Sequence, residues 1–444
     1  MTPDAPARRP RAAARPARRR APSTTPSTTP AAEDPQARLW GDDDASTGFF
    51  VEVRDFDRFG ARSLRGETLG VPTFTNEFWT ARQRQADGLH EVSYRACFKP
   101  QLPAFFIDRL TRPGDRVYDP FMGRGTTPLE AALRGRAPLG NDKNPLCAQL
   151  VAPRLDPPTV EEVEARLGQL DLRGAAPDDD DLRTFFHPET LAELAALRAH
   201  LQARERAGAL DRVDRWLRMV ALNRLTGHSS GFFSVYTLPP NQAVTAQAQR
   251  VINARRGQTP PRREVAPRIV DKTRALLRDL DDAARARLAL AAEQAVLLTG
   301  PADATPALAD GSVDLVVTSP PFLDVVDYAT DNWLRGWFAG VDVAGVGLTT
   351  PRDLGAWQAA MTAVLRELRR VLRPGGHVAF ETGEVRGGKV RLEEAVIPCA
   401  REAGLRPLLV MINQQAFTKT ANCWGVDNRV KGTNTNRITV LVRD

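Results

Sequence analysis

The chain has 444 residues, 42% of them hydrophobic, so it is long enough to bury a large core and to form more than one lobe. No apolar stretch approaches the roughly 18 residues of a membrane-spanning helix, and no apolar segment of a secretory signal is present, so we expect a cytoplasmic protein without membrane contact. Residues 1–30 contain seven Arg and one Asp, and so carry +6 of the net charge of +7. Any polyanion-binding surface in the rest of the chain must therefore be local.

Cysteine and histidine residues are few and scattered. The four Cys occur without a CxxC pair, which argues against a disulfide framework and a zinc site. The five His show no metal-ligand spacing. The sequence therefore predicts no metal, and a reducing compartment fits best.

Residues 1–38 consist almost entirely of Ala, Pro, Arg, Ser and Thr. Such a composition buries too little apolar surface to offset the entropy of ordering, so we expect a disordered tail. An Arg-rich tail either adds sequence-independent affinity for nucleic acid or only keeps the protein soluble, and both interpretations stay open. The remaining predicted domains are 39–151, 152–294 and 295–444.

The segment 39–151 contains a pattern typical of nucleotide binding. A helix near Pro103 leads into a strand over 116–119, and then a glycine-rich turn opens a second helix and a strand that ends at Asp142. Gly123 and Gly125 let the backbone approach a ligand, and the following helix start presents free N–H groups. Asp142 has the spacing of an acid that binds ribose hydroxyls. We expect an adenosine-type cofactor, and not ATP, because the Lys-Ser/Thr of a phosphate loop is lacking.

The segment 152–294 interrupts this rhythm with apolar residues at helical spacing, which predicts a helical insert lobe. A polar and aromatic loop over 227–250 either faces substrate or packs internally. The stretch 249–275 holds eight basic and two acidic residues, so it is either a DNA-binding surface or a solvated helix face. The candidate DNA-binding residues in it are Arg255, Arg256, Arg262 and Arg263.

The segment 295–444 supplies the rest of a mostly parallel sheet of seven strands, of which the last two pair as a hairpin. Residues 312–322, SVDLVVTSPPF, form a buried strand that stops at two prolines. The prolines fix the backbone and leave carbonyl oxygens that no helix or sheet uses, which suits a planar ring bearing an amino group. A bare SPP turn would usually be only a strand end. The loop 413–436 is too long and polar for a mere connection, and its Lys419, Arg429 and Lys431 are further candidate DNA contacts.

Both motifs together resemble amino-group DNA methyltransferases that use S-adenosylmethionine. DPFMGRGTT, from Asp119 to Thr127, resembles the cofactor loop of that family, and Ser319-Pro320-Pro321-Phe322 resembles its catalytic loop. YRACFKPQLPAFFIDRL resembles the motif that closes over the methionine end. The resemblance implies an α/β class I methyltransferase, or Rossmann-like, fold. The cofactor loop precedes the catalytic loop, whereas many cytosine-N4 enzymes carry the two in the opposite order.

The resemblance also implies roles for individual residues. The predicted cofactor-binding residues are Asp119, Phe121, Gly123, Gly125, Thr126, Asp142 and Asp303, with Asp142 on the ribose and Asp303 on the adenine amino group. The predicted catalytic residues are Ser319, Pro320, Pro321 and Phe322. Ser319 and the Pro320 carbonyl would accept hydrogen bonds from the target amine, and Phe322 would stack on a base flipped out of the duplex.

The expected activity is site-specific methylation of cytosine N4 in double-stranded DNA, because Ser heads the catalytic loop where adenine-N6 enzymes usually carry Asp. Adenine-N6 methylation is the alternative, and methylation of guanine N2 in RNA is less favoured. A DNA-binding module with a vestigial cofactor fold is a further alternative. The only Cys after a Pro, Cys399, falls in a predicted helix, so a carbon-5 mechanism is not expected. A cognate restriction endonuclease is a candidate partner.

Overall fold

The computed structural model describes residues 44–80, 86–94, 97–237, 244–322, 328–347, 351, 353–385, 390–414, 422–423, 426–427 and 435–444. The predicted tail over residues 1–38 and the candidate DNA contacts Lys419, Arg429 and Lys431 lie outside these residues. The described part of the chain belongs to one compact unit that begins near Asp44.

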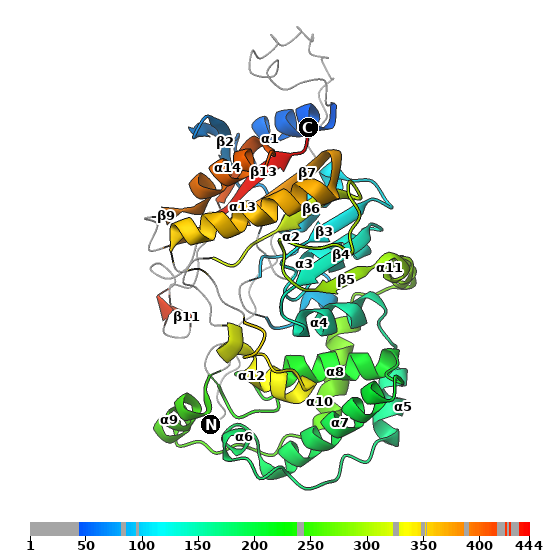
Figure 1. The fold of residues 1–444 in the computed structure, drawn as a ribbon. Coiled ribbons are helices and arrows are strands. Elements are labelled where there is room, and N and C mark those ends of the chain that lie inside the picture. The colour runs from blue at the N-terminus through cyan, green and yellow to red at the C-terminus, as the bar shows by residue number, and fades with distance from the viewer. Residues whose placement is uncertain are drawn as a thin grey trace, which may run out of the picture. The chain divides into compact units, whose positions relative to one another are not determined.

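A nine-stranded mixed sheet forms the centre of this unit (Figure 1). Its order is β1-β2-β10-β13-β7-β6-β3-β4-β5. The strands are β1 (Leu64–Thr68), β2 (Val71–Asn76), β3 (Arg116–Asp119), β4 (Ala137–Asp142), β5 (Val296–Thr299), β6 (Val313–Thr318), β7 (Leu372–Thr382), β10 (Arg406–Gln414) and β13 (Thr435–Val442). Short strand pairs outside it are β8 (Glu384–Val385) with β9 (Val390–Arg391), and β11 (Asn422–Cys423) with β12 (Val426–Asp427).

Seven strands of this sheet are the predicted ones. Strands β5, β4, β3, β6 and β7 run parallel, and β13 is antiparallel to both β7 and β10. The expected hairpin of the last two strands pairs Gln414 with Thr435. The predicted Rossmann-like sheet is therefore confirmed. The carboxyl ends of β3, β4, β5 and β6 meet at one edge, where open α/β sheets bind ligands.

Strands β1 and β2 are not among the predicted elements. They extend the sheet beyond β10, to which β2 is parallel. Leu69 and Gly70 connect them with φ angles of 49° and 78°, so both adopt the left-handed conformation of a tight hairpin turn. Leu rarely adopts this conformation, so Leu-Gly is a weak turn signal.

Helices cover both faces of the sheet. On one face lie α13 (Leu354–Val371) and α14 (Leu392–Glu402), and their apolar side chains share a core with Tyr118, Val316 and Phe380 of the strands. Helices on the other face are α1 (Asp44–Arg54), α2 (Gln101–Leu110), α3 (Thr126–Leu133) and α11 (Asp282–Gln294). Because the central strands are buried on both faces, consecutive residues such as Leu315, Val316 and Val317 of β6 are all apolar.

A second core is helical. It joins η3 (Gly88–His90), α4 (Leu146–Leu155), α5 (Val160–Gln169), α6 (Asp180–Arg183), α7 (Pro188–Arg206), α8 (Arg212–Arg224), α9 (Ala246–Arg256), α10 (Val265–Leu277) and α12 (Tyr328–Ala339). Most of these helices lie between β4 and β5 in sequence, as the predicted helical insert does. Helix α12 instead follows the catalytic loop, and Trp333 meets the ring of Phe185 with 5.6 Å between centroids. No local pattern in the sequence indicates that α12 joins this core.

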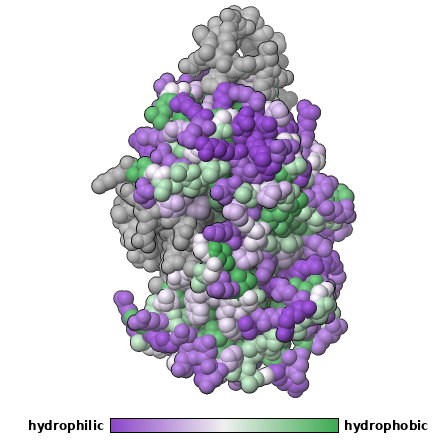
Figure 2. Space-filling model, viewed as in Figure 1, coloured by the Kyte–Doolittle hydropathy of each residue, from purple (hydrophilic) through white to green (hydrophobic). Residues whose placement is uncertain are grey.

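In Figure 2, hydrophilic side chains gather over the end of α13 and the start of β7. Among the residues of these two elements, Arg366, Arg369 and Arg373 are exposed. This is the amino-terminal edge of the parallel strands, opposite to the edge that carries the predicted site. Among the described helices, none is long and apolar enough to cross a membrane.

Candidate functional site

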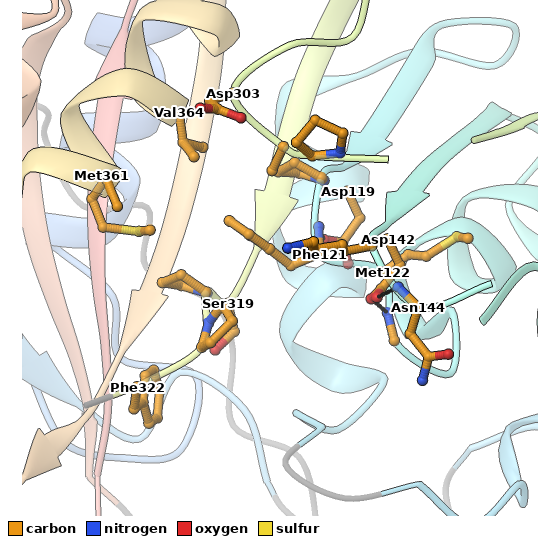
Figure 3. A pocket seen from close by; sticks show the side chains of 18 of the residues that line it. Asp119, Phe121, Met122, Asp142, Asn144, Asp303, Ser319, Phe322, Met361 and Val364 are labelled. Atoms are coloured by element: carbon orange, nitrogen blue, oxygen red, sulfur yellow. Dashed lines mark hydrogen bonds between the residues drawn. The ribbon is translucent and has the colours of Figure 1, made fainter. Parts of the chain in front are cut away.

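A cavity of about 350 Å³ lies at the carboxyl ends of the parallel strands, and both sequence motifs line it (Figure 3). The predicted site residues that line it are Asp119, Phe121, Gly123, Thr126, Asp142, Asp303, Ser319, Pro320, Pro321 and Phe322. Residues separated by about two hundred positions in sequence thus meet at one place. Gly125 is the one predicted cofactor residue that does not line the cavity.

Two hydrogen bonds join the cofactor loop to the catalytic strand. Thr318 Oγ1 and Asp119 Oδ1 are 2.6 Å apart, and Thr127 Oγ1 donates to the Val317 carbonyl at 3.0 Å. All four residues are almost fully buried. Thr318 directly precedes Ser319, so these bonds fix the start of the catalytic loop relative to the cofactor loop.

Asp119 is a buried carboxyl group in the floor of the cavity. Burial raises its pKa to about 7, although the hydrogen bonds from Thr318 and the Phe121 amide act in the opposite direction. The Phe121 amide donates to Oδ1 at 3.0 Å. Because Oδ1 accepts from the protein itself, Asp119 shapes the loop as well as facing the cavity.

Asp142 ends β4 and closes the turn of the cofactor loop. The Gly123 amide donates to its Oδ2 at 2.9 Å, and the Asn144 amide donates to its Oδ1 at 2.9 Å. Burial raises the pKa of Asp142, and these two amide donors oppose that effect. The carboxylate therefore fixes the position of Gly123 at the cavity wall.

Gly123 and Gly125 both have positive φ, but for different reasons. At Gly123, with φ of 50°, a methyl group would face the Tyr94 ring and Cys97 Sγ at 3.6 Å, inside the cavity wall. At Gly125, with φ of 78°, it would lie 2.3 Å from Val151 Cγ2 of α4. Its missing side chain lets the start of α3 pack closely against α4. The contact of the Gly125 backbone with a ligand stays a prediction.

Arginine side chains hold the segment before α2 against the cofactor loop. Arg124 donates to the carbonyls of Val92 at 3.1 Å and Phe98 at 3.4 Å. Arg154, which is fully buried, donates to the carbonyls of Leu89 and Arg124. The segment resembling the motif over the methionine end is thus attached to the loop it was expected to cover.

The catalytic loop is held by α13. Trp357 Nε1 donates to the Pro321 carbonyl at 2.9 Å, so a side chain uses this carbonyl although no helix or sheet ladder does. No described residue donates to the Pro320 carbonyl. Phe322 is half-buried against the core under α13 and lines the cavity. Met361 and Val364 of the same helix lie across the cavity from Asp119 and Asp142 (Figure 3).

Glu381, near the end of β7, is a site residue that sequence reasoning missed. It is 5% exposed, it hydrogen-bonds to Ser319, and it accepts from Asn436 Nδ2 at 3.0 Å. Burial raises its pKa to about 7, and the hydrogen bonds from Ser319 and Asn436 oppose that effect. The available signal was an acid directly after the apolar run Val378–Phe380, in the strand that lies beside the catalytic strand.

Residues 38–152 match the model of the N6/N4 DNA methylase family. The match covers about a quarter of the 444-residue chain. The matched range, here called the methylase region, contains the cofactor loop, Asp142 and α4.

Relatives outside this family model are distant. A type II methyltransferase, M.MjaII of Methanocaldococcus jannaschii, is 30% identical over 83 residues, which are 19% of this chain and 15% of that relative. A TehB-like S-adenosylmethionine-dependent methyltransferase from Corynebacterium glutamicum is 10% identical, with 79% of this chain and 90% of that chain covered and a TM-score of 0.29. A protein from Thermus thermophilus named as a DNA modification methylase, solved with S-adenosylmethionine, is 23% identical over 32% of this chain and 53% of that chain, with a TM-score of 0.22. TM-scores this low do not establish a shared fold, so the fold assignment rests on the sheet order.

The cavity fits the cofactor that the methylase region implies. Its polar end holds the carboxylates of Asp119 and Asp142, which suit a ligand with a positive charge and hydroxyl groups. Its other walls include Pro301, Ala302 and Val364, which suit an apolar purine face. The described residues contain no cluster of three or more His, Cys, Asp or Glu that could hold a metal ion.

The positive charge of the basic stretch 249–275 is partly balanced by carboxylates from other segments of the chain. Four of its eight basic residues lie within 4 Å of carboxylates from other segments: Arg250 with Asp181, Arg262 with Glu189 and Glu193, Lys272 with Glu91, and Arg274 with Glu164. Among the described residues, Arg255, Arg256 and Arg263 have no such partner, and Arg256 instead lies over the Tyr236 ring. Of the four candidate DNA contacts in this stretch, Arg262 is therefore the least available.

Cys399 lies in α14 as expected, with its Sγ donating to the Ala395 carbonyl at 3.1 Å. It is buried and does not line the cavity. The geometry gives this thiol a packing role, not a nucleophilic one.

Proposed function

We propose that this protein is a site-specific DNA methyltransferase that transfers a methyl group from S-adenosylmethionine to the exocyclic N4 of cytosine in double-stranded DNA. The observation that carries the proposal is the junction of the two loops: the Asp119–Thr318 and Thr127–Val317 hydrogen bonds bring the cofactor loop of the methylase region to Ser319. A vestigial cofactor fold would not need an intact catalytic loop at that junction.

The cofactor is S-adenosylmethionine, which supplies an electrophilic methyl group when bound. Asp142 would bind the ribose hydroxyls, and Asp303, which follows β5 in the cavity wall, would bind the adenine amino group. The methionine part would lie against Asp119 and the backbone at Gly123, where the absence of a side chain leaves room.

The catalytic loop acts on the target amine. An aryl amine is a poor nucleophile because its lone pair is delocalised into the ring. Ser319 Oγ and the Pro320 carbonyl, as fixed acceptors, favour the pyramidal geometry in which the lone pair is free to attack. Phe322, half-buried at the cavity wall, offers a face on which a flipped base can stack.

Glu381 acts as a positioning residue behind Ser319. When its carboxylate is ionised, Glu381 accepts a hydrogen bond from the Ser319 hydroxyl. This bond leaves an Oγ lone pair directed toward the substrate amine. Asn436 holds the same carboxylate from β13. The pKa of Glu381, about 7, would allow it to take up a proton as the amine loses one.

Double-stranded DNA is the proposed substrate. Of the four candidate DNA contacts in the basic stretch, Arg255, Arg256 and Arg263 remain for phosphate contacts. Lys419, Arg429 and Lys431, outside the described residues, remain proposed contacts as well. Ser319 at the head of the loop favours cytosine N4 over adenine N6.

Nucleoside mass spectrometry tests the proposal. DNA from a host that lacks amino-group methylation should acquire N4-methylcytosine when it expresses this protein, and not when it expresses Ser319→Ala. Detection of N6-methyladenine instead would keep the protein an amino-group DNA methyltransferase and would make adenine its target base. No methylated base in DNA, with methylated guanine in RNA, would overturn the choice of DNA.

A further inference from the structure

The loop from Gly227 to Phe233, which follows α8, has an exposed tip on a buried base. Phe232 folds back under the loop: a methyl group at Gly227 would lie 2.4 Å from its ring. Phe232 and Phe233 are buried, whereas Ser229, Ser230 and Gly231 are exposed. The two aromatic anchors therefore present two hydroxyls and one glycine to solvent.

Arg224, the last residue of α8, lies directly beneath this tip. Its guanidinium carbon is 4.3 Å from the centroid of the Phe232 ring, and a methyl group at Gly231 would lie 3.6 Å from its Nη1. Its Nε is buried and has no hydrogen-bond partner among the described residues. The positive charge is thus partly desolvated and available on the side that faces the tip.

The charge of Arg224 is not balanced locally. Glu91 is the acid whose charge raises the pKa of Arg224, but Glu91 already pairs with Arg278 at 2.8 Å and Lys272 at 3.6 Å. A further cation holds the tip from the other side, because Arg268 Nε donates to the Ser230 carbonyl at 3.0 Å. Arg268 has no carboxylate within 4 Å among the described residues. Neither of the two cations that contact the tip, Arg224 and Arg268, is therefore paired with a carboxylate among the described residues.

The tip is also tied to the wall of the cofactor cavity. Asn223, next to Arg224, accepts from the Ser93 amide at 3.0 Å and donates to the Glu91 carbonyl at 3.2 Å. The next residue, Tyr94, lines the cavity. The base of the tip is thus linked through Asn223 to the residues that precede Tyr94 in the cavity wall.

We propose that the Ser229-Ser230-Gly231 tip, with Arg224 beneath it, binds a phosphodiester of the DNA backbone near the target nucleotide. The Ser hydroxyls can donate hydrogen bonds to phosphate oxygens, Gly231 allows close approach of the backbone, and Arg224 supplies the charge. This inference rests on the proposed function, since it assigns a contact to the same substrate. It predicts a contact that positions the duplex and does not read its sequence.

Binding of a short fluorescent duplex over a range of salt concentrations tests this contact, with three variants compared. Arg224→Gln removes the charge, and Ser229→Asp places a carboxylate over Arg224 without changing the buried base. Arg274→Gln removes an exposed cation of α10 that pairs with Glu164, and is the matched control. Retained binding of S-adenosylmethionine shows that each variant is folded.

Arg224→Gln and Ser229→Asp should each weaken DNA binding roughly tenfold, as expected for the loss of one charge-assisted contact. Each should also flatten the dependence of log K on log salt by about 0.9, the value for one phosphate. Arg274→Gln should change neither quantity. Wild-type affinity and slope in both tip variants would overturn the inference and leave the proposed function intact. No duplex binding by the wild-type protein would overturn both.

Discussion

Ser319 and Asp142 line one cavity, but Ser319 is assigned to the target amine and Asp142 to the cofactor. Calorimetry can test these two assignments separately. Ser319→Ala should leave the affinity for S-adenosylmethionine nearly unchanged, while methyl transfer falls by about 10²–10³-fold, the usual loss for one fixed hydrogen-bonding group. Asp142→Ala should instead weaken cofactor binding first, because it loses both the proposed ribose contact and the hydrogen bond that holds Gly123. Equal loss of cofactor in both variants would mean that the two loops are wrongly assigned.

Glu381 makes stability depend on pH. Its pKa rises from 4.5 to about 7 on folding, so the folded protein holds this proton more tightly than the unfolded chain. The stability that it contributes is full below about pH 4.5 and is lost as the pH rises through about 7. Glu381→Gln removes this dependence.

Urea unfolding at the two ends of that range measures the effect. Between about pH 4.5 and pH 8, the wild-type protein should lose up to about 3 kcal/mol more of its free energy of unfolding than Glu381→Gln, at 1.36 kcal/mol per unit of pKa. Asp119, whose pKa is also about 7, titrates in both proteins and cancels in the comparison. Parallel pH curves would show that Glu381 is not buried against Ser319 as described.

The residues of the two motifs could be predicted because each motif is continuous in sequence. Asp119, Asp142 and Ser319 all line the cavity. Glu381 and Trp357 could not be predicted, since their partners Ser319 and Pro321 are brought to them only by the pairing of β6 with β7 and the packing of α13.

The contact between α3 and α4 depends on Gly125. Gly125→Ala should lower the free energy of unfolding by about 2–4 kcal/mol, through strain at positive φ and overlap with Val151. Gly123→Ala should cost only about 1 kcal/mol, because its nearest neighbours are 3.6 Å away, yet it should weaken cofactor binding.

The double variant Gly125→Ala/Val151→Ala is the control, since the smaller side chain removes the closest overlapping atoms. It should recover part of the loss, as a double-mutant cycle in chemical denaturation would show. Equal losses in the Gly123 and Gly125 variants, without recovery, would contradict the packing role of Gly125.

Helix α13 orients the catalytic loop through a single hydrogen bond. Trp357→Phe keeps most of the buried ring but loses the donor to the Pro321 carbonyl. We expect kcat to fall about tenfold with little change in cofactor affinity, because a loop that is free to shift misaligns the reacting groups. Unchanged kcat in steady-state kinetics would show that the prolines alone fix the loop.

Elements with a strong local pattern are predictable from the sequence, and elements defined by distant contacts are not. The parallel strands are apolar runs and the long helices have helical spacing. The hairpin β1–β2 escapes prediction because its strands are short and its turn begins with Leu69 in a left-handed conformation. The place of α12 escapes prediction because Trp333 meets Phe185 only after the chain has returned from the sheet to the helical core.

For the whole molecule, most of the net positive charge lies in residues 1–30, ahead of the described structure. Deleting residues 1–38 should leave the thermal unfolding midpoint and the pattern of methylated sites unchanged, and should reduce DNA affinity at low salt, because an Arg tail makes only phosphate contacts. A truncated protein that unfolds, or that methylates other sites, would contradict this.

We propose that one cavity brings a bound methyl donor to an amino group of a base in DNA. This can be tested by transfer of a labelled methyl group from S-adenosylmethionine to duplex DNA by the purified protein, followed by digestion and identification of the labelled nucleoside. We expect label on N4-methylcytosine with the wild-type protein and none with Ser319→Ala at saturating cofactor. Label that stays off DNA under conditions in which the protein binds both ligands, or label on carbon 5 of cytosine, would contradict it.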